Sequence, residues 1–598
     1  MCGIIGYTAD QPEQSVLDVV TNGLSRLEYR GYDSAGVAIV NSTLEVYKRE
    51  GELERLEQVL PEQSLGGRAG IGHTRWSTHG PPSDANAHPH TDCHDTVAVV
   101  HNGIIENYLS LREELEAAGH AFESKTDTEV IPHLIEDALE QGADFDTAFR
   151  RTVDRLEGSY AVAAVRSGHD TIYTARNQSP LVVGIDDECY YVASDVPAFL
   201  EYTDDVIYLK DGQVATIRPS GIEITDERGS IVELPVETVS WDAEDAGKSG
   251  YDHYMLKEIH EQPRAVRQCL RGRSQTLTGS VSIAELEDVP SPEQVHFVAC
   301  GTSYHASLYG AQLLRERGKQ AYAFLASEYN SEMIPLTEKT LVIGVTQSGE
   351  TADTLRALRD ARKSNAKTVA VTNVVGSSAS READHVLYIR AGPEIGVAAT
   401  KTFASQQVAL AMLSSVLMDE CSREFVEALR GLPDQIQSVL DESKAKRIAE
   451  KYVDSDAYFF IGRGYDAPVA REGALKMKEI TYKHAEGFPA GELKHGPLSL
   501  VTNRTPVFAI VTRNSKAEKM VGNIKEVTSR EAPVVAVTDA ADLVEPHVDQ
   551  VLEVPTTHWR FTPILTNIQL QLVSYWVANH LDRSIDKPRH LAKSVTVE

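Results

Sequence analysis

The second residue of the chain is a cysteine, Cys2, and Gly3-Ile4-Ile5-Gly6 follows it. Removal of Met1 would leave Cys2 with an α-amino group of pKa about 8 beside a thiol of pKa about 8.5. One residue would then carry both a nucleophile and a base that can take the thiol proton. The alternative is a small buried residue near an unprocessed N-terminus, and Cys2 alone does not decide between the two.

Four polar residues lie at the ends of apolar runs in the first 240 residues. Asn102 and Gly103 offer a side-chain amide and a backbone N–H, which are the donors that an oxyanion formed by a cysteine nucleophile needs. Arg75 and Asp127 suit the carboxylate and the ammonium of a free amino acid. Each has an ordinary alternative: Asn-Gly is a common hairpin turn, Thr126-Asp127 a helix N-cap, and Arg75 a surface ion pair.

Hydroxyl residues stand between apolar runs and helical segments further along the chain, as Thr302 and Ser303 and then as Gln347, Ser348 and Thr351. Helix N-termini with free N–H groups and hydroxyls bind phosphate without net positive charge. Ordinary capping by serine and threonine is the alternative. Neither junction has the GxxxxGK[ST] spacing, so nucleotide binding is not indicated.

Candidates for acid–base chemistry gather between residues 471 and 497, where Lys476, Glu479, Lys494 and His495 occur. Lys476 and Glu479 are three residues apart and would share one face of a helix, although a surface ion pair would explain that spacing equally well. The chain ends in a short extended tail that contains Lys593. Such a tail is usually disordered or merely docked.

The first 240 residues combine short β-rich runs with helical segments, which favours antiparallel sheets layered with helices. We expect helices at roughly 12–29, 105–118, 127–141 and 146–157. The β-rich runs are CGIIGY (2–7), AGVAIV (35–40), AGIGHTRW (69–76), TVAVVHNGII (96–105), GSYAVAAV (158–165), TIYTAR (171–176), ECYYVAS (188–194) and DVIYLKDGQVATI (205–217).

An internal duplication follows, in which 296–305 aligns with 458–467, 341–346 with 507–512, 369–373 with 535–539, and 385–389 with 550–554. Each repeat alternates apolar strands with helical segments, which predicts doubly wound parallel αβα units whose ligands bind beyond the carboxyl ends of the strands. We therefore expect an α/β multidomain protein with domains at 2–240, 251–430 and 431–585, a linker at 241–250 and a tail at 586–598.

The length and composition of the chain limit its number of domains, its kinds of binding partner and its cellular compartment. A chain of 598 residues should hold two to four domains. The net charge of −30 disfavours nucleic acid and anionic membranes as partners. Six cysteines without CxxC pairing argue against a disulfide framework or a zinc site and fit a reducing compartment. No apolar run reaches the ~20 residues of a spanning helix and no signal peptide is visible, so we expect a cytoplasmic protein.

Several motifs resemble the glutaminase domain of class II glutamine amidotransferases: the initial Cys-Gly-Ile, RLEYRGYDSAG (26–36), HTRWSTHG (73–80), HNGIIEN (101–107) and TDTEV (126–130). The resemblance implies an N-terminal nucleophile hydrolase with an αββα sandwich. It implies that Cys2 forms a γ-glutamyl thioester and that Asn102 and Gly103 form the oxyanion hole. The glutamine-binding residues would be Arg75, Trp76, Thr78, His79 and Asp127, with Trp76 gating an ammonia passage.

A second motif set resembles the paired sugar isomerase domains of the glutamine–fructose-6-phosphate aminotransferase (isomerizing) family: CGTSYH (300–305), QSGETADTL (347–355), AGPEIGVAATKTF (391–403), LKMKEITYKHAEGF (475–488), GELKHGPL (491–498) and LAKSVTVE (591–598). The resemblance covers nearly the full length. It implies transfer of the amide nitrogen of L-glutamine to D-fructose 6-phosphate, giving D-glucosamine 6-phosphate and L-glutamate, the first step of hexosamine synthesis. No metal or organic cofactor is implied.

The same resemblance assigns roles to residues of the repeats. Lys593 would form a Schiff base with the open keto sugar, Glu479 would move a proton between its first two carbons, and Lys476 would support the site. His495 would assist ring opening from a neighbouring subunit, which implies a homodimer or a higher homo-oligomer. The sugar-phosphate ligands would be Thr302, Ser303, Gln347, Ser348, Thr351, Val397 and Ala592.

Two other functions remain open. One is a deglycase or a related aminotransferase that uses the same architecture on a different phosphosugar. The other is a non-catalytic sugar-phosphate sensor, which the joint presence of Cys2, Glu479, His495 and Lys593 disfavours.

Overall fold

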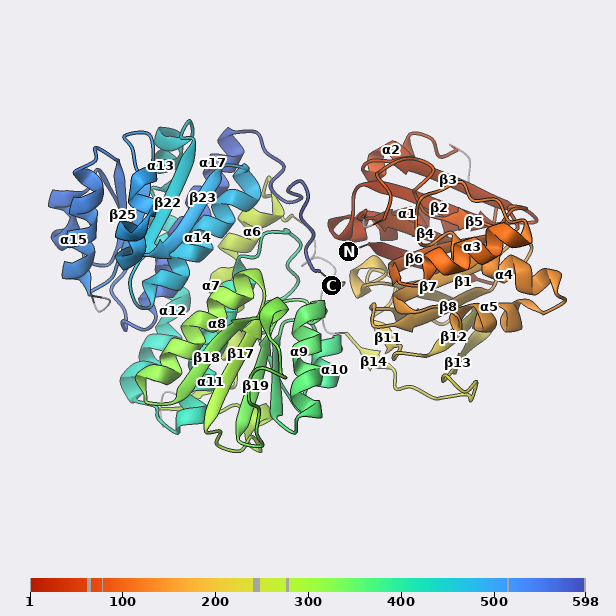
Figure 1. The fold of residues 1–598 in the computed structure, drawn as a ribbon, viewed down its shortest axis with the longest axis horizontal. Coiled ribbons are helices and arrows are strands. Elements are labelled where there is room, and N and C mark those ends of the chain that lie inside the picture. The colour runs from red at the N-terminus through yellow and green to blue at the C-terminus, as the bar shows by residue number, and fades with distance from the viewer. Residues whose placement is uncertain are drawn as a thin grey trace. The chain divides into compact units, whose positions relative to one another are not determined.

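The computed structural model describes residues 2–61, 66–77, 79–239, 248–275, 279–513 and 516–595. The chain divides into two compact units, one of residues 1–246 with 592–598 and the other of residues 247–591 (Figure 1). Most of the predicted linker at 241–250 lies outside the described residues. The four predicted domain boundaries therefore stay predictions.

The first unit contains two antiparallel sheets. The eight-stranded sheet has the order β14 (Glu237–Thr238), β11 (Asp205–Tyr208), β9 (Val182–Ile185), β10 (Cys189–Ala193), β1 (Gly3–Ala9), β4 (Ala69–Arg75), β2 (Ser34–Val40) and β3 (Leu44–Glu50). The six-stranded sheet has the order β13 (Gly221–Thr225), β12 (Val214–Arg218), β8 (Ile172–Asn177), β7 (Gly158–Arg166), β6 (Val97–Ile105) and β5 (His90–Thr91).

Side chains that alternate along these strands separate the unit into four layers. In β1, Ile4 packs into the core between the two sheets, whereas Ile5 packs under the helices. In β6, Ala98 faces the same inner core and Val99 faces the opposite helical layer. The eight-stranded sheet is covered by α1 (Val16–Leu27) and α2 (Leu53–Glu57), and the six-stranded sheet by α3 (Tyr108–Ala118), α4 (Val130–Glu140) and α5 (Phe145–Val153). The predicted αββα sandwich is confirmed.

The predicted β-rich run at 205–217 is confirmed, and it is divided between the two sheets. It contains β11 and β12, which belong to different sheets. A turn at Asp211-Gly212 separates them, and Gly212 adopts a φ of 76° that favours glycine. The chain therefore crosses from one sheet to the other at the polar segment in the middle of this run.

The second unit contains two five-stranded parallel sheets of the same strand order. The first has the order β18 (Gln320–Leu325), β17 (Gln294–Ala299), β19 (Thr340–Val345), β20 (Lys367–Thr372) and β21 (His385–Tyr388). The second has the order β23 (His484–Pro489), β22 (Ala457–Gly462), β24 (Val507–Val511), β25 (Val534–Thr538) and β26 (Gln550–Glu553). All four aligned segment pairs fall on equivalent strands, so the predicted duplication is confirmed.

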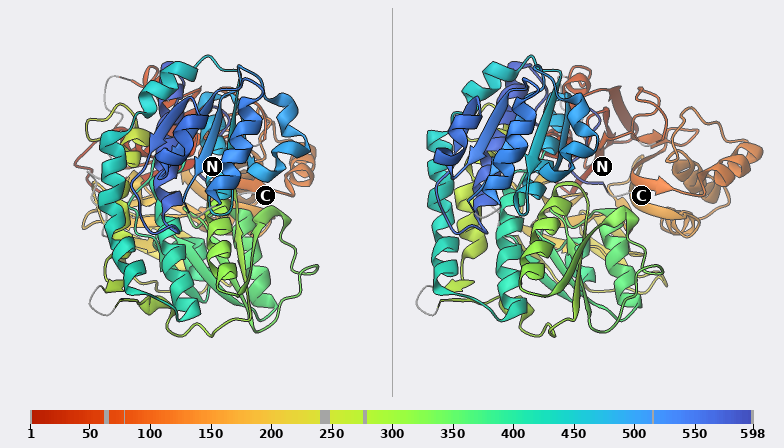
Figure 2. Two further views of the ribbon diagram at one scale, coloured as in Figure 1. Left: turned by 90° about the vertical axis from the view of Figure 1, so that its left-hand side faces the viewer. Right: turned by 60° about the vertical axis from the view of Figure 1, so that its left-hand side comes forward.

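Helices cover both sheets (Figure 2), and buried side chains of both repeats form one shared core. Both α11 (Lys401–Met418) and α17 (Thr562–His580) are buried along nearly their whole length, and polar residues such as Gln406 and Gln571 are buried in them beside the apolar ones. The helices are α6 (Tyr254–His260), α7 (Gln262–Leu270), α8 (Gly301–Glu316), α9 (Ala352–Lys363), α10 (Ser378–Glu382), α11 (Lys401–Met418), α12 (Arg423–Glu442), α13 (Ala445–Tyr452), α14 (Asp466–Thr481), α15 (Ala517–Thr528), α16 (Ala541–Val544) and α17 (Thr562–His580). A short hairpin of β15 (Ser274–Gln275) and β16 (Ser280–Val281) lies apart from the sheets. Among the described residues, no helix is long and apolar enough to span a membrane.

In each parallel sheet, the strands that come first and third along the chain lie side by side: β17 beside β19, and β22 beside β24. The chain therefore leaves these two neighbouring strands in opposite directions. In open α/β sheets, ligands bind in the crevice beyond the carboxyl ends of strands at such a switch point. A ligand site is therefore expected at the segments that follow β17 and β19 in the first repeat, and β22 and β24 in the second.

Candidate active sites

Cys2 directly precedes β1, next to the end of the neighbouring strand β4, since Gly3 pairs with Thr74. The Trp76 backbone N–H, just beyond β4, donates to Cys2 Sγ at 3.2 Å. The Cys2 carbonyl accepts from Asn102 Nδ2 at 2.9 Å and from Arg30 Nε at 3.2 Å. The half-buried thiol is thus held by strand register and hydrogen bonds rather than by apolar packing alone, which favours the nucleophile over the buried-residue alternative.

Asn102 and Gly103 lie inside β6 and pair with Ala161 and Tyr160 of β7, so the hairpin-turn alternative is wrong. Gly103 has a φ of 128°, and a Cβ there would lie 1.9 Å from the Ser159 carbonyl oxygen. Only glycine fits this position. Its neighbour Asn102 therefore stands at a distorted point of a strand, with its side-chain amide directed at the Cys2 backbone.

A buried histidine fixes the orientation of the Asn102 amide. His73 Nε2 lies 3.0 Å from both Asn102 Oδ1 and the His101 carbonyl. Both partners are acceptors, so Nε2 carries the proton and donates. Burial lowers the pKa of His73 to about 3, which keeps this ring neutral. The arrangement leaves the Asn102 NH₂ group facing Cys2, as an oxyanion donor must.

Arg75 and Asp127 are both buried in the same unit, with 3% and 4% of their surfaces exposed. Arg75 is therefore no surface ion pair; its Nη2 donates to the carbonyls of His79 and Gly80. Asp127 Oδ2 accepts from the Ile105 N–H at 2.8 Å, and α4 begins only at Val130, so the N-cap alternative is wrong as well. Burial lowers the pKa of the Arg75 guanidinium, and the nearby side chains of Cys2 and Asp127 act against this.

The remaining predicted glutamine residues lie on the same connection after β4. The Trp76 ring packs edge-on against Tyr32, with centroids 5.6 Å apart, and His79 packs similarly on Tyr108 at 5.4 Å. The Ser77 N–H donates to Asp33 Oδ2 at 2.8 Å, which anchors the connection. Thr78 lies outside the described residues.

The second unit holds a buried row of charges on one face of α14. Lys476 Nζ lies 2.5 Å from Glu479 Oε2 and 3.5 Å from Glu472 Oε1. Glu472 and Lys476 have side chains 0% and 1% exposed, so the surface-ion-pair alternative is wrong. Glu479 keeps 19% of its side chain exposed, so within this row it is the carboxylate that a ligand can reach.

The two carboxylates of this row differ in proton affinity. Burial acts to raise the pKa of Glu472, but Lys476, His305 and Thr302 outweigh it, so that its pKa lies below the ordinary value. Burial raises the pKa of Glu479 above the ordinary value despite the attraction of Lys476. Carboxylates whose environments push their pKa values apart take different roles. Glu472 suits a permanent anion, and Glu479 suits a group that takes up and returns a proton.

Two residues of this cluster, Glu472 and His305, were not among the predicted site residues. Glu472 Oε2 lies 2.7 Å from His305 Nδ1, and Glu472 Oε1 accepts from Thr302 Oγ1 at 3.0 Å. His305 and Thr302 belong to the first turns of α8, so Glu472 ties the two repeats together at the switch point. The spacing of Glu472, Lys476 and Glu479, at i, i+4 and i+7, was the sequence signal that could have found Glu472.

The predicted phosphate-binding residues lie at the carboxyl ends of β17 and β19, on both sides of the switch point. Ser303 Oγ accepts from Gln406 Nε2 at 2.9 Å, and Ser348 Oγ accepts from the Glu350 N–H at 3.1 Å. Thr351 is the N-cap of α9 but makes no capping hydrogen bond; its hydroxyl meets that of Thr346 at 3.1 Å. Plain capping therefore does not explain this junction.

The other predicted sugar residues lie in separate segments. The Val397 N–H donates to the Asp586 carbonyl at 3.0 Å. Gln347 is half-buried, and its carbonyl accepts from the Asn373 N–H at 3.1 Å. His495 is exposed, while its neighbour Lys494 forms a surface ion pair with Glu526 at 2.7 Å.

The terminal segment contributes Ala592 and Lys593, which group with the first unit. Both are half-buried. Their predicted roles, like those of the other site residues, stay predictions.

Comparisons with known proteins agree with both motif sets. A family model described as glutamine amidotransferase domain matches residues 73–201, and one described as SIS domain matches 291–416 and 451–581. Curated proteins of Halobacterium salinarum and Methanosarcina acetivorans, both named glutamine–fructose-6-phosphate aminotransferase (isomerizing), are 49% and 46% identical over 100% of either chain. A solved structure, the C-terminal domain of glucosamine-fructose-6-phosphate aminotransferase from Francisella tularensis, covers 57% of this chain and 99% of its own at 36% identity and a TM-score of 0.54. The chain belongs to the glutamine–fructose-6-phosphate aminotransferase (isomerizing) family.

Proposed function

We propose that this enzyme transfers the amide nitrogen of L-glutamine to D-fructose 6-phosphate and isomerises the product to D-glucosamine 6-phosphate. One observation carries the proposal: a single chain has a cysteine held beside an oriented amide donor and, in another unit, a partly exposed carboxylate paired with a buried lysine on α14. The names of the full-length relatives support the same reaction.

In the first half-reaction, the Cys2 thiolate attacks the γ-carbonyl carbon of glutamine and forms a tetrahedral oxyanion. Asn102 Nδ2 and the Gly103 N–H stabilise that oxyanion, while Arg75 and Asp127 hold the α-carboxylate and the α-ammonium. The α-amino group of processed Cys2 passes the thiol proton to the leaving nitrogen, so that ammonia departs and a thioester remains. Water then releases glutamate and restores the thiol.

In the second half-reaction, Lys593 condenses with the C2 ketone of the open sugar and releases water. Ammonia, passing a gate at Trp76, replaces Lys593 on the imine carbon. The imine is an electron sink, so the Glu479 carboxylate can take a proton from C1 and return it to C2, which gives the 2-amino aldose. Lys476 holds Glu479 in place, and the hydroxyls of Ser303, Ser348 and Thr351 bind the phosphate together with the two helix N-termini.

The proposal extends to the surroundings of the enzyme. We place it in the cytoplasm and expect a homodimer in which His495 of one chain assists ring opening in the other.

A paired product assay tests the proposed function. The protein is incubated with glutamine and fructose 6-phosphate, and glutamate and glucosamine 6-phosphate are quantified together. We expect equal amounts of both, no product from Cys2→Ala, and unchanged products from Cys421→Ala, a cysteine of the other unit. Glutamate without amino sugar would mean that another phosphosugar is the acceptor. Ligand binding without either product would support the sensor instead.

A further inference from the structure

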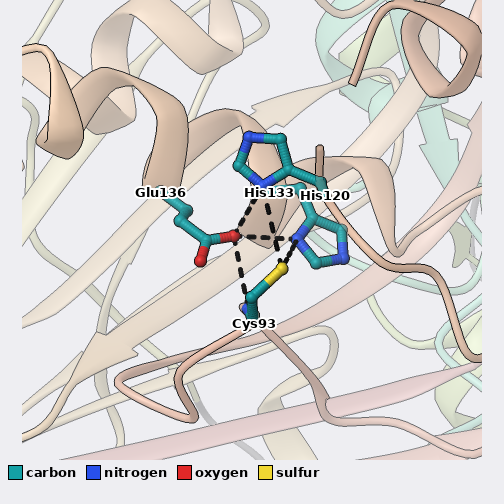
Figure 3. A group of neighbouring side chains, drawn as sticks. All are labelled: Cys93, His120, His133 and Glu136. Carbon is teal, nitrogen blue, oxygen red and sulfur yellow. Dashed lines mark hydrogen bonds and ion pairs between the residues drawn. The ribbon is translucent and has the colours of Figure 1, made fainter. Parts of the chain in front are cut away.

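Four potential metal ligands converge in the first unit, away from the cysteine site. Cys93 lies in the turn between β5 and β6, His120 lies two residues beyond the end of α3, and His133 and Glu136 lie one turn apart on α4. Figure 3 shows the four side chains pointing toward one another from these three segments. Their ligand atoms all lie within 4.8 Å of one another.

The distances between these atoms outline a small tetrahedron. Cys93 Sγ lies 3.6 Å from His133 Nδ1 and 3.8 Å from His120 Nδ1. Glu136 Oε2 lies 2.8 Å from His120 Nδ1 and 3.0 Å from His133 Nδ1. Bond lengths of about 2.0–2.3 Å in a tetrahedral zinc site place neighbouring ligand atoms roughly 3.3–3.6 Å apart. The cluster therefore needs shifts of only a few tenths of an ångström to hold an ion.

The ligand set matches the same metal. One thiolate, two imidazoles and one carboxylate make a closed four-ligand site, which is the pattern of structural rather than catalytic zinc. His120, His133 and Glu136 are buried, whereas Cys93 is exposed and leaves a way in for the ion. We propose that Cys93, His120, His133 and Glu136 bind a structural Zn²⁺.

Binding requires defined proton movements. Zn²⁺ displaces the proton of the Cys93 thiol, and each imidazole must present an unprotonated Nδ1 to the ion. In the metal-free cluster each ring donates from Nδ1 to Glu136, so both Nδ1 atoms lose their protons when they bind the ion, and a neutral ring regains a proton from solvent at Nε2. Zinc binding therefore releases protons and weakens as the pH falls.

The position of the cluster gives the metal a structural role. His120 and His133 flank the segment that carries Asp127, the proposed ligand of the glutamine ammonium. Within that segment, Thr126 Oγ1 lies 3.1 Å from His90 Nε2, and Thr128 Oγ1 lies 2.9 Å from His101 Nδ1. An ion bound by His120, His133 and Cys93 would link both ends of this segment to the turn before β6.

The sequence contains no CxxC pair, and this absence argued against a zinc site. Cys93 is 27 residues from His120 and 40 from His133, and no short spacing links them. Only the packing of α4 against the β5–β6 turn brings the ligands together. His133 and Glu136 alone show a local spacing, and i,i+3 pairs are common on ordinary helices.

Metal analysis of the full-length protein tests the proposal. The protein is prepared without a histidine tag or chelator, equilibrated with micromolar Zn²⁺ and desalted, and its zinc content is measured by mass spectrometry. We expect about one zinc per chain in wild type, loss of it in Cys93→Ser and His120→Ala, and retention in Cys421→Ser. Zinc should also raise the Tm of wild type but not of Cys93→Ser.

A second readout separates coordination at this cluster from adventitious binding. Co²⁺ in place of Zn²⁺ should give a thiolate charge-transfer band that disappears in Cys93→Ser while circular dichroism shows that this variant is folded. Wild-type protein without bound zinc would overturn the proposal, leaving a cluster held by hydrogen bonds alone. Zinc that persists in Cys93→Ser would also overturn it, since the metal would then lie elsewhere.

Discussion

Single residues explain the chemistry best where one side chain controls the state of another. Lys476 is a buried cation between two carboxylates, and its placement divides their roles: Glu472 remains charged, while Glu479 has a raised pKa and the exposure to meet a ligand. His73 has a comparable influence in the other unit, because its neutral ring orients the Asn102 amide toward Cys2. Both controlling residues are buried, so neither acts on a substrate directly.

Glu479→Gln should abolish proton exchange on the sugar while leaving glutamate release from glutamine intact. General acid–base catalysis is worth about 10²–10⁴-fold, and the formation of amino sugar should fall by that factor. Deuterium incorporation from heavy water at the first two carbons of the sugar measures the step. Glu486→Gln, an exposed carboxylate on the adjacent strand β23, is the matched control.

The pH profile gives an independent check on Glu479. A base must be unprotonated, and its raised pKa means that the rate should decline at a higher pH than an ordinary carboxyl would give as the solution is acidified. The acid limb of kcat for amino sugar formation reports this value. A limb at or below the ordinary carboxyl range would contradict the assignment.

Asn102→Ala and Asp127→Asn should affect different kinetic parameters of glutamate release. Loss of an oxyanion donor lowers kcat by about 10²–10³-fold with little change in the KM for glutamine. Asp127→Asn keeps an acceptor for the Ile105 N–H but removes the charge, so it should raise that KM about 10–100-fold. Steady-state kinetics with glutamine as the varied substrate distinguishes them, and a change in the same parameter for both variants would argue against these roles.

At the scale of elements, the site depends on loops that leave parallel strands with unusual backbone angles. The loop between β19 and α9 contains Gly349, whose φ is 72°, and a Cβ there would lie 2.1 Å from Ser377 Oγ. This glycine lets the loop fold back, so that Ser348 and Thr351 lie at the carboxyl end of the strand. Glycine is needed here for both the backbone angle and the space.

Gly349→Ala should destabilise the protein by about 1–3 kcal/mol and raise the KM for fructose 6-phosphate, since the loop must shift to admit the methyl group. Thermal unfolding and steady-state kinetics measure the two effects. Gly431→Ala in α12 is the control, because nothing lies within 4 Å of its Cβ position. That control should leave the KM unchanged and stabilise the protein slightly.

Strands buried on both faces were predictable from sequence, whereas edge strands were predicted only in part, as with β21 and β26. The central strands β17, β19, β22 and β24 read as continuous apolar runs and were found in both repeats. The edge strands β3, β18 and β23 carry polar or exposed residues and were missed, because one neighbour and partial solvent contact leave a weak pattern.

The candidate site followed the same rule. Residues in sequence motifs, such as Asn102 and Glu479, were predicted. The contacts of Glu472 with α8 and the Cys93 cluster join elements far apart in the chain, and although Glu472 shares a helical spacing with Lys476, no local spacing indicates these long-range contacts.

At the scale of the whole molecule, the exposed position of His495 bears on the proposed homodimer. His495 is exposed at the end of a short helical segment, Ala490–His495. We propose that it acts in a partner chain. A chain lacking Glu479 and a chain lacking His495 would then complement each other.

Coexpression of Glu479→Gln and His495→Ala chains should restore about a quarter of wild-type activity, although each variant alone is inactive. Random pairing makes half of the dimers mixed, and one of the two sites in each mixed dimer has both residues. Purification through two different tags isolates the mixed dimer, which should have about half of wild-type activity. An inactive mixed dimer would show that His495 serves its own chain.

The most direct test of the central claim follows the glutamine nitrogen itself. The enzyme is given glutamine labelled with ¹⁵N at the amide, fructose 6-phosphate, and an excess of unlabelled ammonium in solution. The account predicts glucosamine 6-phosphate that carries ¹⁵N at the enrichment of the glutamine, because ammonia passes between the two half-reactions without release. Amino sugar that carries the unlabelled nitrogen, or glutamate formed without any amino sugar, would contradict it.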